Sequence, residues 1–210
     1  MYPEASILLP TASFPHVSYF VLLTSGKKIF IEQVETFPKQ TYRNRCEILT
    51  SSGILNLVVP VSKPGGNHTI TKDVRLTYRE RWNLHHWKSI QTAYRSSPYF
   101  NYYSDIIEPL FNRKYNTLTE YNLSALTILK KILGVDFDLE FTTDYLKDPG
   151  DLKDYRALFS PKQKISSFFL PEYPQVFSHK FGFTRDLSIL DLVFNLGPQS
   201  IDYLKKVNYT

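Results

Sequence analysis

The feature that most constrains the fold is a succession of three short segments near the start of the chain. Ala5 to Leu9 is an apolar run that Pro10 stops, and Lys28 to Ile31 is a second apolar run. Between them, His16 to Leu23 reads as a short helix that ends at Ser25-Gly26. Strand, helix and strand in this order form the minimal unit of a parallel sheet. The sequence therefore predicts an α/β fold.

A hairpin and a helix-rich second half follow this unit. Arg45 to Leu49 and Ile54 to Val61 read as strands around a turn at 50–53, and the second strand is almost entirely apolar, as a buried central strand is. From Arg79 onward the apolar residues recur at helical spacing. Further helices are predicted at 102–111, 118–133 (ended by Gly134), 188–195 and 198–206. We expect one α/β domain over residues 1–210, with a mixed sheet in its N-terminal half and α+β as the alternative class.

Composition restricts the classes of partner. The 210 residues suffice for one domain with a real core, and the net charge of +5 comes without runs of Lys or Arg, so we expect no nucleic-acid binding. No window approaches the roughly 20 apolar residues of a membrane helix, so no membrane insertion is expected. The start of the chain lacks the pattern of a signal peptide, and we expect a cytoplasmic protein. Cofactor and oligomeric state stay undetermined.

A dense set of polar side chains follows the second predicted strand, within IFIEQVETFPKQTYRNR at 29–45. The ends of parallel strands are where open α/β sheets bind their ligands. Two carboxylates at this strand end, Glu32 and Glu35, are candidate catalytic bases. The donors that follow suit a small anionic ligand or a sugar nucleotide, and the candidate substrate-binding residues are Lys39, Tyr42, Arg43, Asn44 and Arg45.

Two interpretations of this set stay open. In an extended segment alternate residues share a face, so Arg43 and Arg45 would point together and clamp an anion, with Asn44 pointing away. Alternatively, Glu32 and Glu35 pair with Lys39, Arg43 or Arg45 in an internal salt-bridge network.

His85 is a third candidate catalytic residue. It precedes His86 and Trp87 on a predicted helix, where adjacent side chains point about 100° apart and cannot readily share a metal ion. His86 falls on the apolar stripe and is expected in the core, whereas His85 lies off it. No phosphate-binding glycine loop, no Cys pair and no serine-hydrolase elbow is present, and we assign no metal site.

Five segments together resemble one known family. They are ILLPTASFPHVSYF, IFIEQVETFPKQTYRNRCEIL, LVVPVSK, RWNLHHWKSIQTAYRSSPYFNYY and FTRDLSILDLVFNLGPQSIDYL. In this order they are similar to the WbqC-like family. Asn44 and Arg45 match the asparagine–arginine pair of that family, while Leu9 stands where many members have glutamine, and Glu32 and Glu35 stand where many have paired aspartates.

The resemblance implies a place in O-antigen-type surface polysaccharide biosynthesis, the family's best-known association. Two hypotheses follow from it. The chain is an enzyme or accessory enzyme, with transferase as the first class to consider, that acts on a nucleotide- or phosphate-linked sugar. The alternative is a non-catalytic binding or scaffold protein of the polysaccharide machinery.

Overall fold

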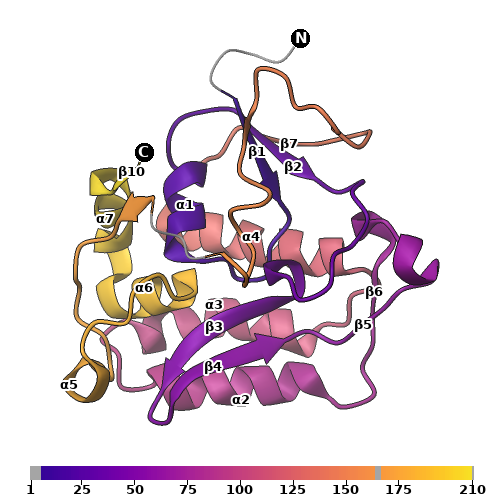
Figure 1. Cartoon of the computed structure of the whole chain (residues 1–210). Helices are drawn as coiled ribbons and strands as arrows, with labels where there is room; N and C mark the ends of the chain where they lie inside the picture. Colours follow the sequence, from indigo (N-terminus) through magenta and orange to yellow (C-terminus); the bar gives the residue numbers. More distant parts are fainter. Residues whose placement is uncertain (1–5, 164–166, 210) are drawn as a thin grey trace.

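A four-stranded parallel sheet lies at the centre of the computed structural model, which describes residues 6–163 and 167–209 (Figure 1). Its spatial order is β7-β2-β1-β8, and the strands are β1 (Ile7–Pro10), β2 (Ile29–Glu32), β7 (Leu139–Phe141) and β8 (Lys153–Asp154). Helix α1 (Val17–Leu23) connects β1 to β2, which pair in parallel. The predicted strand–helix–strand unit and the α/β class are therefore confirmed.

The strands are distributed differently from the predicted mixed sheet. The two outer strands of the parallel sheet, β7 and β8, come from the second half of the chain. The hairpin β3 (Arg45–Thr50) and β4 (Gly53–Val58) is antiparallel as expected, but it forms a separate two-stranded ribbon. The apolar strand β4 is not buried, because it pairs only with β3, and Ile54 is 55% exposed.

Helices fill most of the second half, close to the predicted positions. The long helices are α2 (Trp82–Tyr94), α3 (Phe100–Asn112) and α4 (Leu118–Leu133), and the C-terminal ones are α5 (Ser178–Phe181), α6 (Ile189–Leu196) and α7 (Ser200–Lys206). Short 3-10 turns occur at η1 (Tyr42–Asn44), η2 (Gly66–His68), η3 (Thr71–Asp73) and η4 (Gly197–Gln199). The remaining strands are the two-residue β5 (Val61–Ser62), β6 (Arg75–Leu76), β9 (Phe168–Phe169) and β10 (Asn208–Tyr209).

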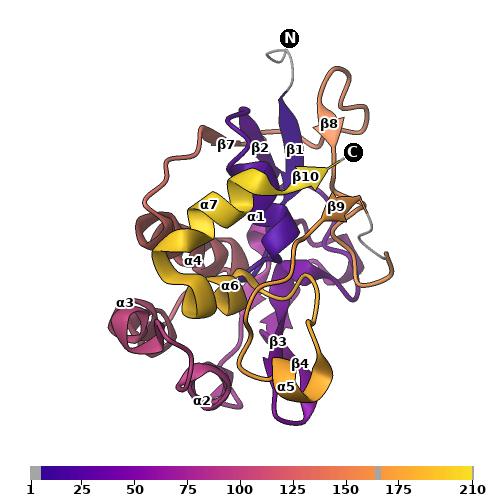
Figure 2. The ribbon, with the colours of Figure 1, turned by 90° about the vertical axis from the view of Figure 1, so that its left-hand side faces the viewer.

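The core lies between the sheet, the ribbon and the helices. In Figure 2 the C-terminal helices α6 and α7 lie beside α1, far from it in sequence. The aromatic ring of Phe194 on α6 packs against Tyr94 on α2 and Phe100 on α3, with ring centroids 5.2 and 5.1 Å apart. None of the helices in the described part of the chain is long and apolar enough to cross a membrane.

Candidate functional site

The carboxyl ends of the four parallel strands meet at one edge of the sheet, which we call the carboxyl edge. Thr11 follows β1, Glu32 ends β2, Thr142 follows β7 and Arg156 lies two residues after β8. Side chains from segments more than 100 residues apart in sequence are thereby brought together. Crevices at this edge are where α/β sheets bind ligands.

Glu32 is completely buried, and both of its carboxylate oxygens are hydrogen-bonded. Oε1 accepts from the backbone N–H of Val34 at 2.8 Å and from the Thr142 hydroxyl at 2.9 Å. Oε2 accepts from the Arg156 guanidinium at 3.1 Å and from the N–H of Leu146 at 3.3 Å. Burial of a polar group is tolerated where its hydrogen-bonding atoms are used in this way. Its position suits a group that ties β2, β7 and β8 together.

Glu35 is held differently from Glu32. The Nε and Nη2 atoms of Arg43 both contact its Oε1, each at 2.6 Å, and Oε2 has no hydrogen bond to the described residues. Burial raises the pKa of Glu35, the negative charge of Glu32 adds to this rise, and the Arg43 guanidinium opposes it. A largely buried carboxyl group with a raised pKa and one oxygen free of hydrogen bonds is a candidate for proton transfer.

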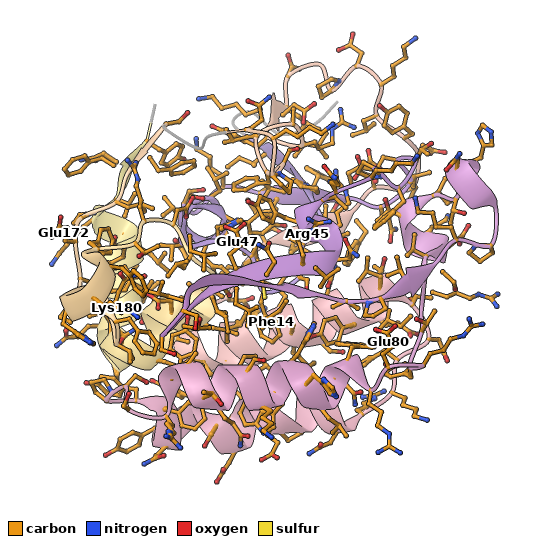
Figure 3. The ribbon with its side chains drawn as sticks, turned by 60° about the horizontal axis from the view of Figure 1, so that its bottom comes forward. Phe14, Arg45, Glu47, Glu80, Glu172 and Lys180 are labelled. Atoms are coloured by element: carbon orange, nitrogen blue, oxygen red, sulfur yellow. The ribbon has the colours of Figure 1, made fainter. Side chains whose placement is uncertain are left out.

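Arg43 and Arg45 do not share a face, contrary to the expectation from an extended segment. Residues 42–44 form the 3-10 turn η1, where alternate side chains no longer point the same way, and Thr41 caps the turn by accepting from the N–H of Arg43. Arg43 is turned toward Glu35 and the Thr41 hydroxyl. Arg45 instead begins β3, where it lies near Glu47 on the same strand (Figure 3).

Three other predicted ligand-binding residues have separate surroundings. The Tyr42 hydroxyl donates to Glu47 at 3.4 Å, and its ring packs edge-on against His16 with centroids 4.2 Å apart. The Asn44 side chain donates to the carbonyl of Val59 at 2.9 Å, which ties η1 to the chain after β4. Lys39 is exposed on the loop before η1.

His85 lies away from the carboxyl edge. It lines a surface groove between β4 and α2, with Leu55 and Lys88. The neighbouring His86 is buried, as expected, and burial lowers its pKa to about 4 while the Val58 carbonyl accepts a hydrogen bond from it. The structure therefore does not bring His85 together with Glu32 and Glu35.

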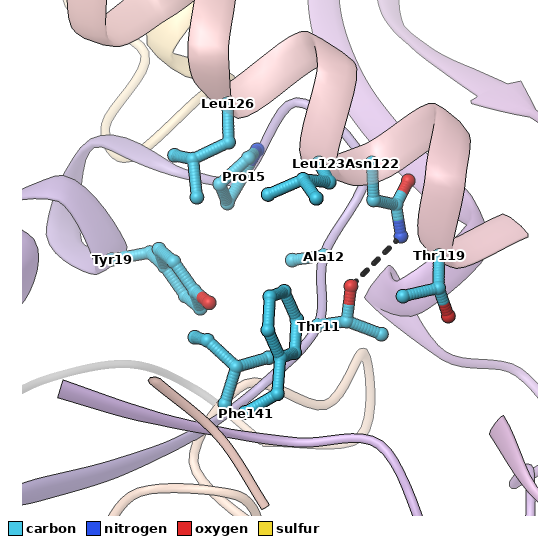
Figure 4. Close-up of a pocket in the computed structure, with 10 residues that line it drawn as sticks. Thr11, Ala12, Pro15, Tyr19, Thr119, Asn122, Leu123, Leu126 and Phe141 are labelled. Carbon is cyan, nitrogen blue, oxygen red and sulfur yellow. Dashed lines mark hydrogen bonds between the residues drawn. The ribbon is translucent and has the colours of Figure 1, made fainter. Parts of the chain in front are cut away.

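A small cavity lies between α4 and the carboxyl edge (Figure 4). Its volume is about 20 Å³, which is room for a single water molecule or hydroxyl group. The Asn122 amide donates to the Thr11 hydroxyl at 3.2 Å and to the Arg43 carbonyl at 2.8 Å. The buried oxygens Asn122 Oδ1 and Thr119 Oγ1 have no hydrogen-bond partner in the described part of the chain. Two residues that line the cavity therefore each carry a buried oxygen without a partner among the described residues.

A larger groove adjoins this cavity, and we call it the α4 groove. It has a volume of about 270 Å³ and runs between α4 and β7. Cavity and groove share three lining residues: Leu123, Leu126 and Phe141. Farther along, Phe137 and Lys130 line the groove, and Lys130 forms an ion pair with the exposed Asp136. An apolar groove that ends in a few polar atoms is typical of small-molecule sites.

Sequence reasoning missed five residues of this site: Thr11, Thr119, Asn122, Thr142 and Arg156. Asn122 carried a usable signal, because it is a polar residue on the otherwise apolar face of a predicted helix. Arg156 and Thr142 carried none, since they reach Glu32 only through the pairing of β8 and β7 with the first two strands. Among residues 6–163 and 167–209, no group of His, Cys, Asp or Glu side chains is arranged to hold a metal ion.

Comparisons with known proteins extend the resemblance seen in the sequence. An uncharacterised protein of Mycobacterium tuberculosis, Rv1507c, is 24% identical over 216 residues, which covers 91% of this chain and 93% of the relative. No solved structure matches the chain. The model of the WbqC-like protein family matches residues 11–163, which include β2 to β8 and every residue of the carboxyl edge described above. The chain belongs to the WbqC-like protein family.

Proposed function

We propose that this protein is an enzyme or accessory enzyme of surface polysaccharide biosynthesis that binds a nucleotide- or phosphate-linked sugar at the carboxyl edge. The observation that carries the proposal is the cavity at this edge, with two unpartnered buried oxygens at the end of an apolar groove. Asn122 Oδ1 and Thr119 Oγ1 can accept hydrogen bonds from the hydroxyl groups of a sugar. The choice of surface polysaccharide biosynthesis as the pathway rests on the resemblance to the WbqC-like family.

The α4 groove suits the remainder of such a ligand. Phe137 and Phe141 offer aromatic surface, against which sugar rings and nucleobases pack. Among the described residues, the partner of Lys130 is an exposed carboxylate, and an exposed ion pair contributes little stability. Lys130 can therefore exchange Asp136 for a ligand phosphate.

Arg43 has a different role from the anion clamp expected from the sequence. Its guanidinium is paired with Glu35 and Thr41, so it orients the Glu35 carboxyl and leaves Oε2 free. In this proposal Glu35 is the general base or acid, whereas Glu32 and Arg156 fix the strand ends. Arg43 is also linked to the cavity, because its carbonyl accepts from Asn122.

Binding is tested by thermal unfolding with a panel of nucleotide sugars. A ligand above its Kd raises the melting temperature by mass action. We expect at least one sugar nucleotide to do so, and Thr119→Val to reduce that shift while leaving the unliganded protein as stable as before, because the lost hydroxyl has no partner. Thr92→Val on α2 is the control, since its hydroxyl donates to the Lys88 carbonyl and does not line the cavity or the α4 groove. No shift with any member of the panel, or an equal shift in Thr119→Val, would contradict the proposal.

The catalytic part of the proposal is tested separately. Glu35→Gln is expected to abolish polysaccharide product in cells while the purified variant still binds the sugar nucleotide. Full product formation by Glu35→Gln would instead favour the non-catalytic scaffold.

A further inference from the structure

Strand β4 has a free backbone edge. Thr50 and Gly53 pair across a two-residue turn, so the hydrogen-bonded pairs of the ribbon are 50–53, 48–55 and 46–57. The N–H and C=O groups of Ile54, Asn56 and Val58 consequently point away from β3. The Val58 carbonyl accepts from His86, whereas the backbone groups of Ile54 and Asn56 have no partner among the described residues.

The opposite edge of the ribbon is covered. The N–H of Ser188 donates to the Glu47 carbonyl on β3 at 2.9 Å. Exposed edge strands of stable proteins are generally protected by lysine, proline or a bulge. Strand β4, with the sequence GILNLV, has no charged residue, no proline and an uninterrupted register with β3. An unprotected edge of this kind is a site where another strand can pair.

A groove lies beside this free edge, and we call it the β4–α2 groove. It has a volume of about 490 Å³, with Thr50 and Leu55 on the ribbon side and Leu84, His85 and Lys88 on the α2 side. Leu55 and Leu84 are 38% and 47% exposed. In Figure 3, α2 runs alongside β4. A cleft between an edge strand and a helix is the geometry in which several domain families bind an extended peptide by strand addition.

The charges around the groove select the partner. Residues 81–95, which include the whole of α2, contain Arg81, Lys88 and Arg95 and no acidic residue. Lys180 donates to the Ser51 carbonyl at the hairpin tip. Glu80 is the nearest acidic residue before α2, and it stands between two arginines in the sequence. A second copy of this chain would bring the same cations together, so charge complementarity favours an acidic partner.

We propose that the β4–α2 groove binds an extended acidic segment of a partner protein, which pairs with β4 as a third strand of the ribbon. The free backbone groups of Ile54 and Asn56 bond its main chain, Leu55 and Leu84 contact its apolar side chains, and Lys88 contacts its carboxylates. This surface is separate from the carboxyl edge, and the proposal does not depend on the sugar-binding function.

The test is a selection of random 12-residue displayed peptides on the intact protein, followed by titration of synthetic copies. We expect acidic sequences with alternating apolar residues. The key variant is Asn56→Pro, which removes an outward N–H and leaves the β3–β4 pairing intact, because proline is tolerated at a strand edge. We expect at least a tenfold loss of affinity for the selected peptide. Lys88→Glu is expected to weaken binding as well, with Lys72→Glu, an exposed lysine outside the groove, as the control.

Either of two results would overturn the proposal. The selection could fail to enrich acidic peptides with alternating apolar residues, or the selected peptide could bind Asn56→Pro as tightly as it binds the wild type. Circular dichroism verifies that Asn56→Pro is folded, and a selected peptide methylated on alternate backbone nitrogens tests the same pairing on wild-type protein. Sedimentation of the protein alone tests the competing occupant, since a dimer that Asn56→Pro dissociates would assign this edge to a second copy.

Discussion

Two glutamates at one sheet edge, three residues apart, have different surroundings because their hydrogen-bond partners differ. Glu32 is bonded through both oxygens, by Arg156 and three other donors. Glu35 is bonded through one oxygen only, by Arg43. The raised pKa of Glu35 and its free Oε2 make it the more suitable of the two for proton transfer.

Arg43 is also the residue whose removal tests the ion pair most directly. Arg43→Gln leaves the Glu35 carboxylate buried without its cation, and we expect a loss of roughly 3 kcal/mol in the free energy of unfolding at pH 7. Arg45→Gln is the matched control, with an expected loss below about 1 kcal/mol, because Arg45 is partly exposed and its Nε has no partner in the described chain. Urea unfolding of both variants measures these values. An equal loss of unfolding free energy in Arg43→Gln and Arg45→Gln would contradict a buried ion pair between Glu35 and Arg43.

The pH dependence of Arg43→Gln has a defined sign. A carboxyl whose pKa is raised in the folded state binds its proton more tightly there, so its ionisation lowers stability as the pH rises through the folded pKa. Without Arg43 this pKa rises further, since the guanidinium opposes the effect of burial. The deficit of Arg43→Gln relative to the wild type should therefore be smaller at pH 5 than at pH 8.

Residue-level sequence reasoning predicted the strand end as the candidate site and offered the Glu35–Arg43 ion pair as one of several alternative pairings. Glu35 with Arg43 was within its scope, because both residues lie in one short segment. The partner of Glu32 was not, since Arg156 is 124 positions away and meets Glu32 only through the sheet. The predicted common face of Arg43 and Arg45 was wrong because a capped 3-10 turn replaces the extended chain at 42–44.

At the level of elements, α4 was the easiest to predict and β4 the hardest. Helix α4 has a capping box of Thr117 and Glu120 at its start and Gly134 at its end, where φ is +63°. These are local signals that the sequence displays directly. An apolar run such as that of β4 occurs both in buried central strands and in exposed edge strands. Its composition therefore predicted a strand but could not predict whether that strand is buried.

The start of α4 carries the unpartnered oxygens of the cavity, which leads to a prediction about the cap. Thr117→Ala removes the capping bonds and should lower the free energy of unfolding by about 1 kcal/mol. Gly134→Ala should lower it by a similar amount, about 1 kcal/mol, since the residue has positive φ and a Cβ there would meet no atom within 4 Å. Only Thr117→Ala frays the turn that holds Thr119 and Asn122, so calorimetric titration should show weaker sugar-nucleotide binding in that variant alone. Equal weakening in both would contradict the proposed cavity.

At the scale of the whole molecule, the family match and the folded core have different limits. The family model ends at residue 163, but the chain beyond it contributes Leu187, Ile189, Leu190, Leu192, Val193 and Phe194, each at most 1% exposed. Ser188 also bonds the carbonyls of Glu47 and Phe14, in the first quarter of the sequence. The C-terminal helices are therefore part of the same core as α1 and β3.

A chain that ends at residue 163 should consequently fail to fold. Six fully buried apolar side chains, at about 1.5–3 kcal/mol each, represent roughly 10 kcal/mol or more of burial, comparable with the whole stability of a typical domain. We expect the truncated protein to lack the near-ultraviolet circular dichroism of packed aromatic rings and to unfold without a cooperative transition. A chain that ends at Lys206 is the control, because it loses β10 and keeps α6 and α7. Cooperative unfolding of the 1–163 chain would show that the matched region folds alone and that residues 167–209 form a separate unit, contrary to the single domain expected from the sequence.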